Sequence, residues 1–485
     1  MTDLPAPAGG SASHGAPGAV TARQADPEAR LDRIPFTREH GKTAAILGFG
    51  TFFDAYDSLI LASALTIVVA TLGHGFFGTG VLISAGFVGQ AIGALLLGSI
   101  SDRYGRAKVF CVALFAFSAL SVLAALSWNL ESLTMARLLQ GIGLGAEVPI
   151  AATLFNEYVQ SKSRGRTFML YESLFGWGTV AAPAMGLLTL TLMPHDVGWR
   201  VLLATGAVPL IGAIYGWRHL PESVRWLSVK GRIAEAEAIV DRLEDSARRH
   251  GRDLPEPVPV PAQPRQATRL GELFARRYLA RTLLNGSLWF TTYFAVYGYS
   301  TWLPSLYVKV GGLPVRTALY LTIIVAAAQV GVIYAMAGVV DRVGRVKILK
   351  IGYVVALFGA LVGYAMVTWF GIESWAALFV AGIMLAAGSY MPAVGLYLYI
   401  PELYPTRMRG WATSAGSSLN RLASVIAPLL VGALLGADLG IGSVFLMFAG
   451  VLLLGLVALF AWGVETAQRS LEETGEPGVE RASKP

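Results

Sequence analysis

Long runs of apolar residues, separated by short polar stretches, dominate the chain. Most runs reach about 20 residues, which is the length an α-helix needs to cross a hydrocarbon core of ~30 Å. Gly and Pro interrupt several runs, which membrane helices tolerate and β-strands do not. The pattern predicts an all-α membrane protein with twelve spanning helices, near 43–71, 79–100, 108–127, 131–158, 167–193, 199–219, 279–308, 316–338, 346–369, 374–400, 410–435 and 441–463.

Two short motifs occur once in each half of the chain, in the same order. Asp102-Arg103-Tyr-Gly105-Arg106 follows the second run, and Asp341-Arg342-Val-Gly344-Arg345 follows the eighth. Glu157 and Glu402 end the fourth and tenth runs in a similar way. The chain is therefore two copies of one six-helix unit. Many solute carriers are built from such parallel repeats, with the substrate site between the halves.

The polar stretches divide the chain into five parts. We expect a disordered tail, two six-helix halves, a linker and a second tail, at 1–40, 41–220, 279–463, 221–278 and 464–485 respectively. The first tail is rich in Pro, Ala and Gly and lacks the apolar run of a signal peptide.

The linker combines two predicted helices with a segment that excludes regular structure. Its stretch 232–249 predicts an amphipathic helix with Ile233, Ile239, Val240 and Leu243 on one side, and 269–277 predicts a short surface helix. Five prolines between 255 and 264 exclude regular structure there. Membrane-surface packing and regulatory docking are the two hypotheses for this linker.

Charge predicts the orientation. Of 38 Lys and Arg residues, only Arg200, Lys309 and Arg316 lie in odd-numbered loops, and Arg137 and Arg421 lie within helices. The positive-inside rule then places both termini in the cytoplasm and the protein in the cytoplasmic membrane. The net charge of +7 reflects these loops and contacts with anionic lipid, so we expect no nucleic-acid partner.

The composition and motifs of the chain argue against an enzyme. Charged residues make up only 14% of the chain and hydrophobic residues 54%, whereas soluble domains carry about a quarter charged residues. Cys111 is the only cysteine, which excludes an internal disulfide, and no Cys/His spacing suits a metal. Nucleophile elbows and nucleotide-binding loops are also missing from the sequence. We expect a monomer in the lipid bilayer that uses no cofactor.

Four motifs together resemble a known family. The two Asp-Arg-x-Gly-Arg loops are similar to the signature of the major facilitator superfamily. Pro221-Glu222-Ser223-Val-Arg225-Trp226-Leu227 resembles the end of helix six in its sugar-porter and organic-ion branches. Val464-Glu465-Thr466 resembles their C-terminal motif, with Val in place of the usual Pro, and the segment 402–410 resembles helix ten of organic-ion and niacin-type carriers. The resemblance covers about residues 40–475 and implies transport by alternating access.

Ionisable residues inside the predicted helices are the candidates for mechanism. A charge at the bilayer centre costs at least ~2.5–3.5 kcal/mol on insertion scales, so each implies a function or a partner. The resemblance aligns Asp57 and Arg137 with the pair that switches proton binding in sugar porters; a static ion pair is the alternative. Asp54 lies on the same helical face as Asp57. Glu147 resembles an acid of niacin-type carriers, as a proton site, substrate partner or structural acid.

Substrate contacts are expected from helices five, seven, ten and eleven. Arg421 suits a carboxylate because its guanidinium is planar and permanently charged, although it could instead neutralise a helix acid. Glu172 stands where sugar porters have a substrate-binding Gln, either in the cavity or solvated near the helix end. Aromatic residues could stack on a planar ring or line a lipid interface. The remaining candidates are Asn285, Trp289, Tyr293, Tyr297, Tyr390, Tyr397 and Asn420.

A cytoplasmic gate is implied by the resemblance alone. In relatives, the loop charges pair with acids at the inner helix ends and hold these ends together in the outward-open state. The candidates are Asp102, Arg103, Arg106, Glu157, Arg166, Glu222, Asp341, Arg342, Arg345, Glu402, Arg409 and Glu465.

These observations favour a secondary transporter that moves a small aromatic or heterocyclic carboxylate together with protons. A sugar or polyol symporter is the alternative, supported by the Pro221-Glu222-Ser223 and Glu465-Thr466 motifs. Against it, helix seven has no Gln-Gln pair and Asn285 is its only amide. Proton-antiport efflux is the third hypothesis, from a weak antiporter-like pattern around Ala182-Pro183.

Overall fold

The computed structural model describes residues 26–72, 75–159, 164–257, 270–372, 374–405 and 408–466. Within these ranges it is helical, with no strand. Eleven helical segments are long and apolar enough to cross a membrane. The twelfth span begins with α11, whose 22 residues include Arg281, Asn285 and Thr291, and these polar groups lower its hydropathy. The twelve-helix prediction is confirmed.

Each half contains six spans. The first half consists of α2 (Arg38–Leu72), α3 (Phe76–Tyr104), α4 (Arg106–Ala125), α5 (Leu130–Tyr158), α6 (Arg164–Leu192), and α7 (His195–Ala204) continued through η1 (Thr205–Ala207) by α8 (Pro209–His219). The second consists of α11 (Leu279–Ser300) continued by α12 (Leu303–Lys309), α13 (Val315–Val343), α14 (Arg345–Thr368), α15 (Trp375–Glu402), α16 (Arg409–Gly436) and α17 (Gly440–Trp462).

Several helices extend beyond the apolar runs that predicted them. α2 begins at Arg38 and α3 continues to Tyr104, so the polar segments 38–42 and 101–104 are also helical. Hydropathy marks the part of a helix that meets lipid, whereas the backbone hydrogen bonds continue into the polar ends.

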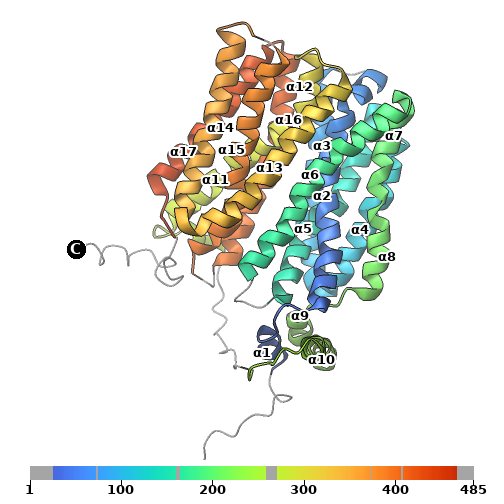
Figure 1. Ribbon diagram of the computed structural model, residues 1–485, viewed down its shortest axis with the longest axis vertical. Helices are drawn as coiled ribbons and strands as arrows, with labels where there is room; N and C mark the ends of the chain where they lie inside the picture. The colour runs from blue at the N-terminus through green and yellow to red at the C-terminus, as the bar shows by residue number, and fades with distance from the viewer. Residues whose placement is uncertain are drawn as a thin grey trace, which may run out of the picture.

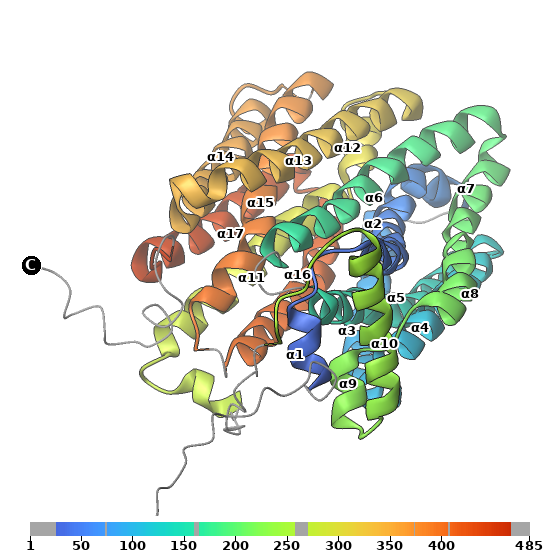
Figure 2. The same ribbon diagram turned by 60° about the horizontal axis from the view of Figure 1, so that its bottom comes forward.

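One helix of the N-terminal tail and two helices of the linker lie together beneath the first half. Figures 1 and 2 show, from two directions, three short helices at one end of the bundle. They are α1 (Pro27–Asp32), α9 (Val224–Val229) and α10 (Ile233–Arg249). We call this end the linker side and the opposite end the far side. The prediction of an amphipathic helix is confirmed, since Ile239, Val240 and Leu243 of α10 are buried, although Ile233 is 42% exposed.

The other linker prediction is only partly met. Residues 270–274 form the 3₁₀ helix η2 (Leu270–Phe274), and the proline-rich residues 258–269 lie outside the described residues.

The expectation of a disordered tail to residue 40 is wrong for residues 26–40. α1 is attached to α10 by a buried ion cluster, in which Arg30 Nη2 lies 3.0 Å from Glu244 Oε2 and Arg33 Nη2 lies 2.7 Å from Glu244 Oε1. Burial opposes ionisation of Glu244, but the hydrogen bonds from Arg30 and Arg33 outweigh it and lower the pKa of Glu244. The rest of this tail, residues 1–25, lies outside the described residues, as does the second tail beyond Thr466.

The two halves meet at mid-depth and toward the far side. Thr66 donates a hydrogen bond to Ser305 (3.2 Å) near the far end of α2, and Ser84 donates to the carbonyl of Val425 (2.7 Å). Gly80 permits the close approach of α3 to α16, because a Cβ there would lie 3.0 Å from the carbonyl oxygen of Pro428. Tyr334 of α13 joins the halves at the level of Ser173 and Trp177 of α6, since Trp177 donates to it (3.2 Å) and it donates to Ser173 (3.4 Å).

Candidate functional site

A cavity lies between the two halves near mid-depth. Its empty space, including the mouth, is about 840 Å³, which is within the usual range for small-molecule sites. Helices α2, α5 and α6 of the first half and α11, α13, α15 and α16 of the second contribute side chains. The lining residues are Asp54, Val148, Glu172, Phe175, Tyr293, Val296, Tyr297, Ile333, Tyr390, Ala393, Val394, Tyr397, Leu398, Asn420 and Arg421.

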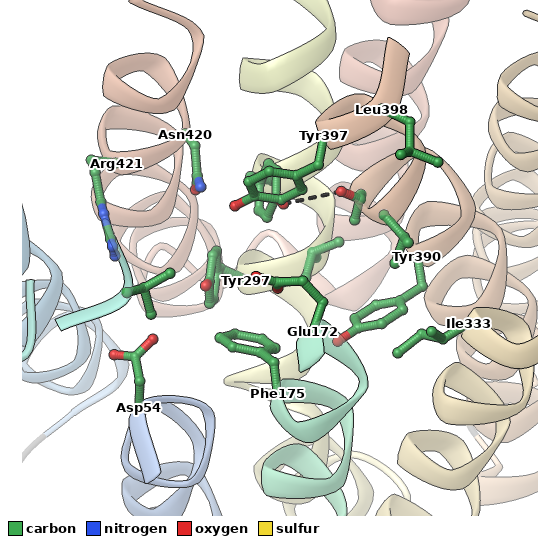
Figure 3. A pocket seen from close by; sticks show the side chains of 15 residues that line it. Asp54, Glu172, Phe175, Tyr297, Ile333, Tyr390, Tyr397, Leu398, Asn420 and Arg421 are labelled. Atoms are coloured by element: carbon green, nitrogen blue, oxygen red, sulfur yellow. Dashed lines mark hydrogen bonds between the residues drawn. The ribbon is translucent and has the colours of Figure 1, made fainter. Parts of the chain in front are cut away.

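Charged groups gather on one side of this cavity. Figure 3 shows the Arg421 guanidinium and the Asp54 carboxylate reaching toward each other from opposite halves. Arg421 Nη1 donates a hydrogen bond to Gln90 Oε1 of α3. Within the described part of the chain, no acidic group lies within 4 Å of Arg421, and Asp54 Oδ1 is buried without a hydrogen-bond partner. The guanidinium therefore has N–H groups available for an anion.

Aromatic rings form the remaining walls. Tyr297 and Tyr397 approach from one direction and Phe175 from another, while Tyr390 lies beside Ile333 across the cavity from Arg421 (Figure 3). Tyr293 donates a hydrogen bond to the carbonyl of Ala393 (3.2 Å), which holds its ring in place. The rings of Tyr293 and Tyr297 stack with centroids 5.9 Å apart. Such a surface can accommodate a planar ring and supply hydroxyl groups at its edge.

Two candidates for substrate contact lie behind the cavity instead. Asn285 donates to the carbonyl of Ala412 (2.8 Å) and therefore fixes α11 on α16. Trp289 is fully buried and stacks on Tyr293 with centroids 5.4 Å apart. Gly416 leaves room for this packing, because a Cβ at that position would lie 2.3 Å from Trp289 Cδ1. Neither side chain is part of the cavity lining.

The Asp57–Arg137 pair lies beside the cavity and is joined by several hydrogen bonds, although Arg137 Nε has no partner among the described residues. Arg137 Nη1 lies 3.0 and 2.8 Å from the two oxygens of Asp57, and its Nη2 donates to the backbone carbonyl of Asp57 (3.2 Å). Gln140 Nε2 donates to Asp57 (2.8 Å) and to Ser121 (2.6 Å). Both charges are buried, at 2% exposed for Asp57 and 6% for Arg137, so their mutual contact is what makes this burial tolerable.

Glu147 differs from Asp57 in having no polar contact. It is 1% exposed, and neither of its carboxylate oxygens has a hydrogen-bond partner among the described residues. It packs against Gly50, where a Cβ would lie 2.3 Å from Glu147 Oε1 and 2.8 Å from Phe110 Cζ. Burying an ionised, unpaired carboxylate costs several kcal/mol of folding free energy. The geometry suits a neutral, protonated carboxyl group.

Two glutamines that the sequence analysis did not single out connect these groups. Gln140 follows Arg137 by one helical turn and completes the shell of Asp57. Gln90 binds Arg421 and also lines a small hollow next to Arg137. Amides in the middle of a membrane helix are a weaker signal than charges, but the i, i+3 spacing of Arg137 and Gln140 could have revealed Gln140.

At the linker side, the first half holds its own helix ends together. Arg106 forms an ion pair with Glu157, and Ser223 Oγ donates to Glu157 Oε2 (2.5 Å). Glu222 accepts hydrogen bonds from the backbone N–H groups of Arg106 (2.8 Å) and Ala107 (3.1 Å), the otherwise unsatisfied donors at the start of α4. We call this group the first clamp.

The second half repeats this arrangement as a second clamp. Arg345 Nε lies 3.4 Å from Glu402 Oε2, to which Thr466 Oγ1 donates (2.5 Å). Glu465 accepts from the backbone N–H groups of Arg345 (2.8 Å) and Val346 (3.2 Å) at the start of α14. The glycine before each capped helix has positive φ, 110° at Gly105 and 103° at Gly344, a conformation that favours glycine.

The remaining gate candidates whose side chains are described take no part in these clamps. Asp102 is 74% exposed with Arg106 3.9 Å away, and Arg103 and Arg342 are exposed as well. Arg409 donates to the carbonyl of Tyr404 (3.1 Å). The side chains of Arg166 and Asp341 lie outside the described residues.

Comparisons with known proteins match this chain to transporters. Residues 44–476 match the family described as sugar (and other) transporter. The niacin transporter NiaP of Acinetobacter baylyi is 33% identical over 92% of this chain and 99% of its own length. The gallate transporter of Pseudomonas putida is 32% identical over 84% of this chain and 87% of its own length.

Solved structures share the fold. The proton:xylose symporter XylE bound to 6-bromo-6-deoxy-D-glucose has a TM-score of 0.66 at 18% identity, covering 92% of this chain and 99% of that one. The inward-open conformation of the Escherichia coli xylose transporter XylE has a TM-score of 0.68 at 17% identity, covering 90% and 99%. At such identity the likeness concerns the fold alone.

Proposed function

Because the chain belongs to the sugar (and other) transporter family of the major facilitator superfamily, we propose that it carries a small aromatic or heterocyclic carboxylate together with protons. The protein is a multi-pass membrane transporter and not an enzyme. The observation that carries the proposal is the Arg421 guanidinium, which borders an aromatic cavity and has no acidic group within 4 Å among the described residues.

The cavity suits such a substrate at both of its ends. Arg421 offers a charge-assisted and potentially bidentate contact to a carboxylate. The rings of Phe175, Tyr297 and Tyr397 offer faces to a planar ring. Glu172 and Tyr390 lie on the far wall, where they can bond ring substituents or a ring nitrogen. The names of two relatives, niacin and gallate transporters, denote aromatic carboxylates and support this substrate class.

The buried acids supply the proton chemistry of the proposal. In the arrangement seen here, Asp57 lies in hydrogen-bond contact with the Arg137 guanidinium, which favours its carboxylate form, whereas Glu147 has no such contact among the described side chains and suits a protonated acid. If Arg137 moved away when the halves rock, Asp57 would become a buried charge without a partner and would bind a proton. Asp54, which borders the cavity, is the third site at which a proton and the substrate could influence each other.

The linker side is, in this proposal, the cytoplasmic side of the inner membrane. Basic residues concentrate in the tails, in the linker and in the loops that share its side. The hydrogen bonds that join the halves among the described residues lie at the level of the cavity and toward the far side. In this proposal the arrangement is therefore the one open to the cytoplasm, from which a substrate taken up would leave.

A sugar or polyol symporter is the alternative, and the chemistry of binding separates it from the acid carrier. A polyol needs hydroxyl and amide groups, which the tyrosines and Asn420 could supply, but it gives Arg421 no counter-charge. We expect benzoate-type and pyridine carboxylates to raise the melting temperature of the purified protein, and their neutral amides and sugars to leave it nearly unchanged.

The expected gain in the free energy of unfolding follows from the ligand concentration. A ligand present at 100 times its Kd adds about 2.7 kcal/mol to the free energy of unfolding. The amide of each acid is the matched control, because it keeps the ring and removes the charge. Stabilisation by sugars alone would replace the acid carrier with the polyol alternative.

The exposed gate residue Asp102 gives a separate prediction. Among the described side chains, the one charged contact of its carboxylate is Arg106 at 3.9 Å. We therefore expect Asp102→Asn to leave this state unchanged and to weaken the state in which the linker-side ends close. Labelling of a cysteine placed at Leu398, in a Cys111→Ser background, should then speed up by as much as about fivefold, from ~1 kcal/mol for a surface ion pair. Lys108→Gln is the control on the same face, and slower labelling in Asp102→Asn would contradict the gate.

A further inference from the structure

A second hollow lies outside the membrane core, on the linker side of the first half. It is bounded by the first turns of α2, the last turn of α8 and the facing side of α10, with about 720 Å³ of empty space including its mouth. Lys42 borders it from α2, Arg218 from α8 and Arg242 from α10. Three elements distant in sequence therefore each bring one permanent cation to the same space.

Most of this positive charge is uncompensated. Glu39 is the one acid in the lining, and it already contacts Lys42 at 2.7 Å. Arg218 and Arg242 are exposed, and in the described ranges neither has an acidic group within 4 Å. Arg242 Nε donates a hydrogen bond to the carbonyl of Ala238 at 3.3 Å. Two guanidinium groups facing one hollow are a phosphate-binding arrangement.

The apolar surroundings indicate what carries the phosphate. The floor of the hollow includes Ile46, Ile239 and Leu243. On α8, the helix that bears Arg218, Ile211 is 69% exposed and Trp217 is 60% exposed. These side chains lie on a membrane span, where such exposure means contact with acyl chains. An occupant that has a phosphate group next to hydrocarbon chains matches both surfaces.

We propose that this hollow binds the phosphate of an anionic phospholipid from the adjacent leaflet, with Arg218 and Arg242 as its principal contacts. A soluble phosphate shares the headgroup chemistry but leaves the apolar face of α8 unused. The wall formed by α10 is held in place by its buried contacts with α1. A bound headgroup would connect α10 to α8 and so hold the linker helices against the first half. This site is independent of the central cavity and of the proposed substrate.

Native mass spectrometry of the detergent-purified full chain tests the proposal. We expect dioctanoyl phosphatidylglycerol to bind and dioctanoyl phosphatidylcholine to bind at least tenfold more weakly, since the choline headgroup cancels the negative charge. The Arg218→Gln/Arg242→Gln variant should lose roughly tenfold or more of the phosphatidylglycerol affinity, as expected for the loss of charge-assisted contacts. Arg249→Gln removes an exposed cation from the same helix α10, outside the hollow, and should change nothing.

Three results would overturn the proposal. Equal binding of the two lipids would show that charge plays no part, and unchanged phosphatidylglycerol binding in the double variant would place the lipid elsewhere. Displacement of the lipid by inorganic phosphate at equal concentration would make soluble phosphate the ligand. If the double variant does not fold, the single variants Arg218→Gln and Arg242→Gln carry the same comparison, each with a smaller expected loss.

Discussion

Asp57→Asn should abolish accumulation of substrate driven by a proton gradient and leave counterflow exchange intact. Asn keeps the size of Asp and an oxygen that can accept from Arg137 Nη1, which now lies 2.8 Å from the nearer Asp57 oxygen. It cannot take up a proton, so the step that depends on protonation is lost while substrate binding remains. Uptake into proteoliposomes with and without an imposed proton gradient, compared with counterflow in the same vesicles, measures both quantities.

The choice of Asn and of a second variant keeps this test interpretable. Asp57→Ala would leave Arg137 buried and unpaired, at a cost of about 3–5 kcal/mol that could unfold the protein. Glu147→Gln is the matched control, because Glu147 is a buried acid on the same side of the cavity that has no ion pair. Full accumulation by Asp57→Asn, together with its loss in Glu147→Gln, would move the coupling role from Asp57 to Glu147.

Arg421→Ala should weaken binding of the carboxylate substrate by roughly ten- to a hundredfold, which corresponds to ~1.5–3 kcal/mol for a charge-assisted hydrogen bond. The neutral amide of the same ring should bind the wild type and the variant almost equally. Arg421→Lys should restore little affinity, because an ammonium group lacks the planar fork of a guanidinium. Calorimetric titration of acid and amide into each variant provides the comparison.

The opposite result has a clear structural meaning. An equal loss for acid and amide would show that Arg421 maintains the cavity, through Gln90 and its field on Asp54, without contacting the carboxylate. Gln90→Ala separates these roles further, since it removes the partner of Arg421 in the other half and leaves the guanidinium itself in place.

Apolar runs predicted the spans, because the hydrocarbon core imposes the same requirement on every helix, although α11 is less apolar than the other eleven. Apolar runs do not predict how a helix is rotated about its axis, and therefore which side chains face the cavity. Trp289, Tyr293 and Tyr297 share a face by spacing, yet Trp289 turns toward α16 and only the two tyrosines reach the cavity. That rotation depends on packing partners such as Gly416, more than 100 residues away, which no local pattern contains.

Long-range contacts account for the other differences. α1 is only six residues long and would not be helical alone. Its stability comes from Glu244, which is 214 residues from Arg30 in the sequence. The clamps show the converse case. Their acids were identified as candidates from the motifs, but the contacts place Glu157 and Glu402 each within its own half.

The hydrogen bond between Arg421 and Gln90 joins the two halves near the middle of the bundle. A substrate carboxylate that engages the guanidinium competes with Gln90 for the same N–H groups. Occupying the site would then exchange a contact between the halves for a contact with the cargo. The loaded and the empty carrier should therefore have different free-energy barriers to the rocking of the halves. Where the return of the empty carrier is the slower step, exchange of substrate across the membrane should be faster than net transport.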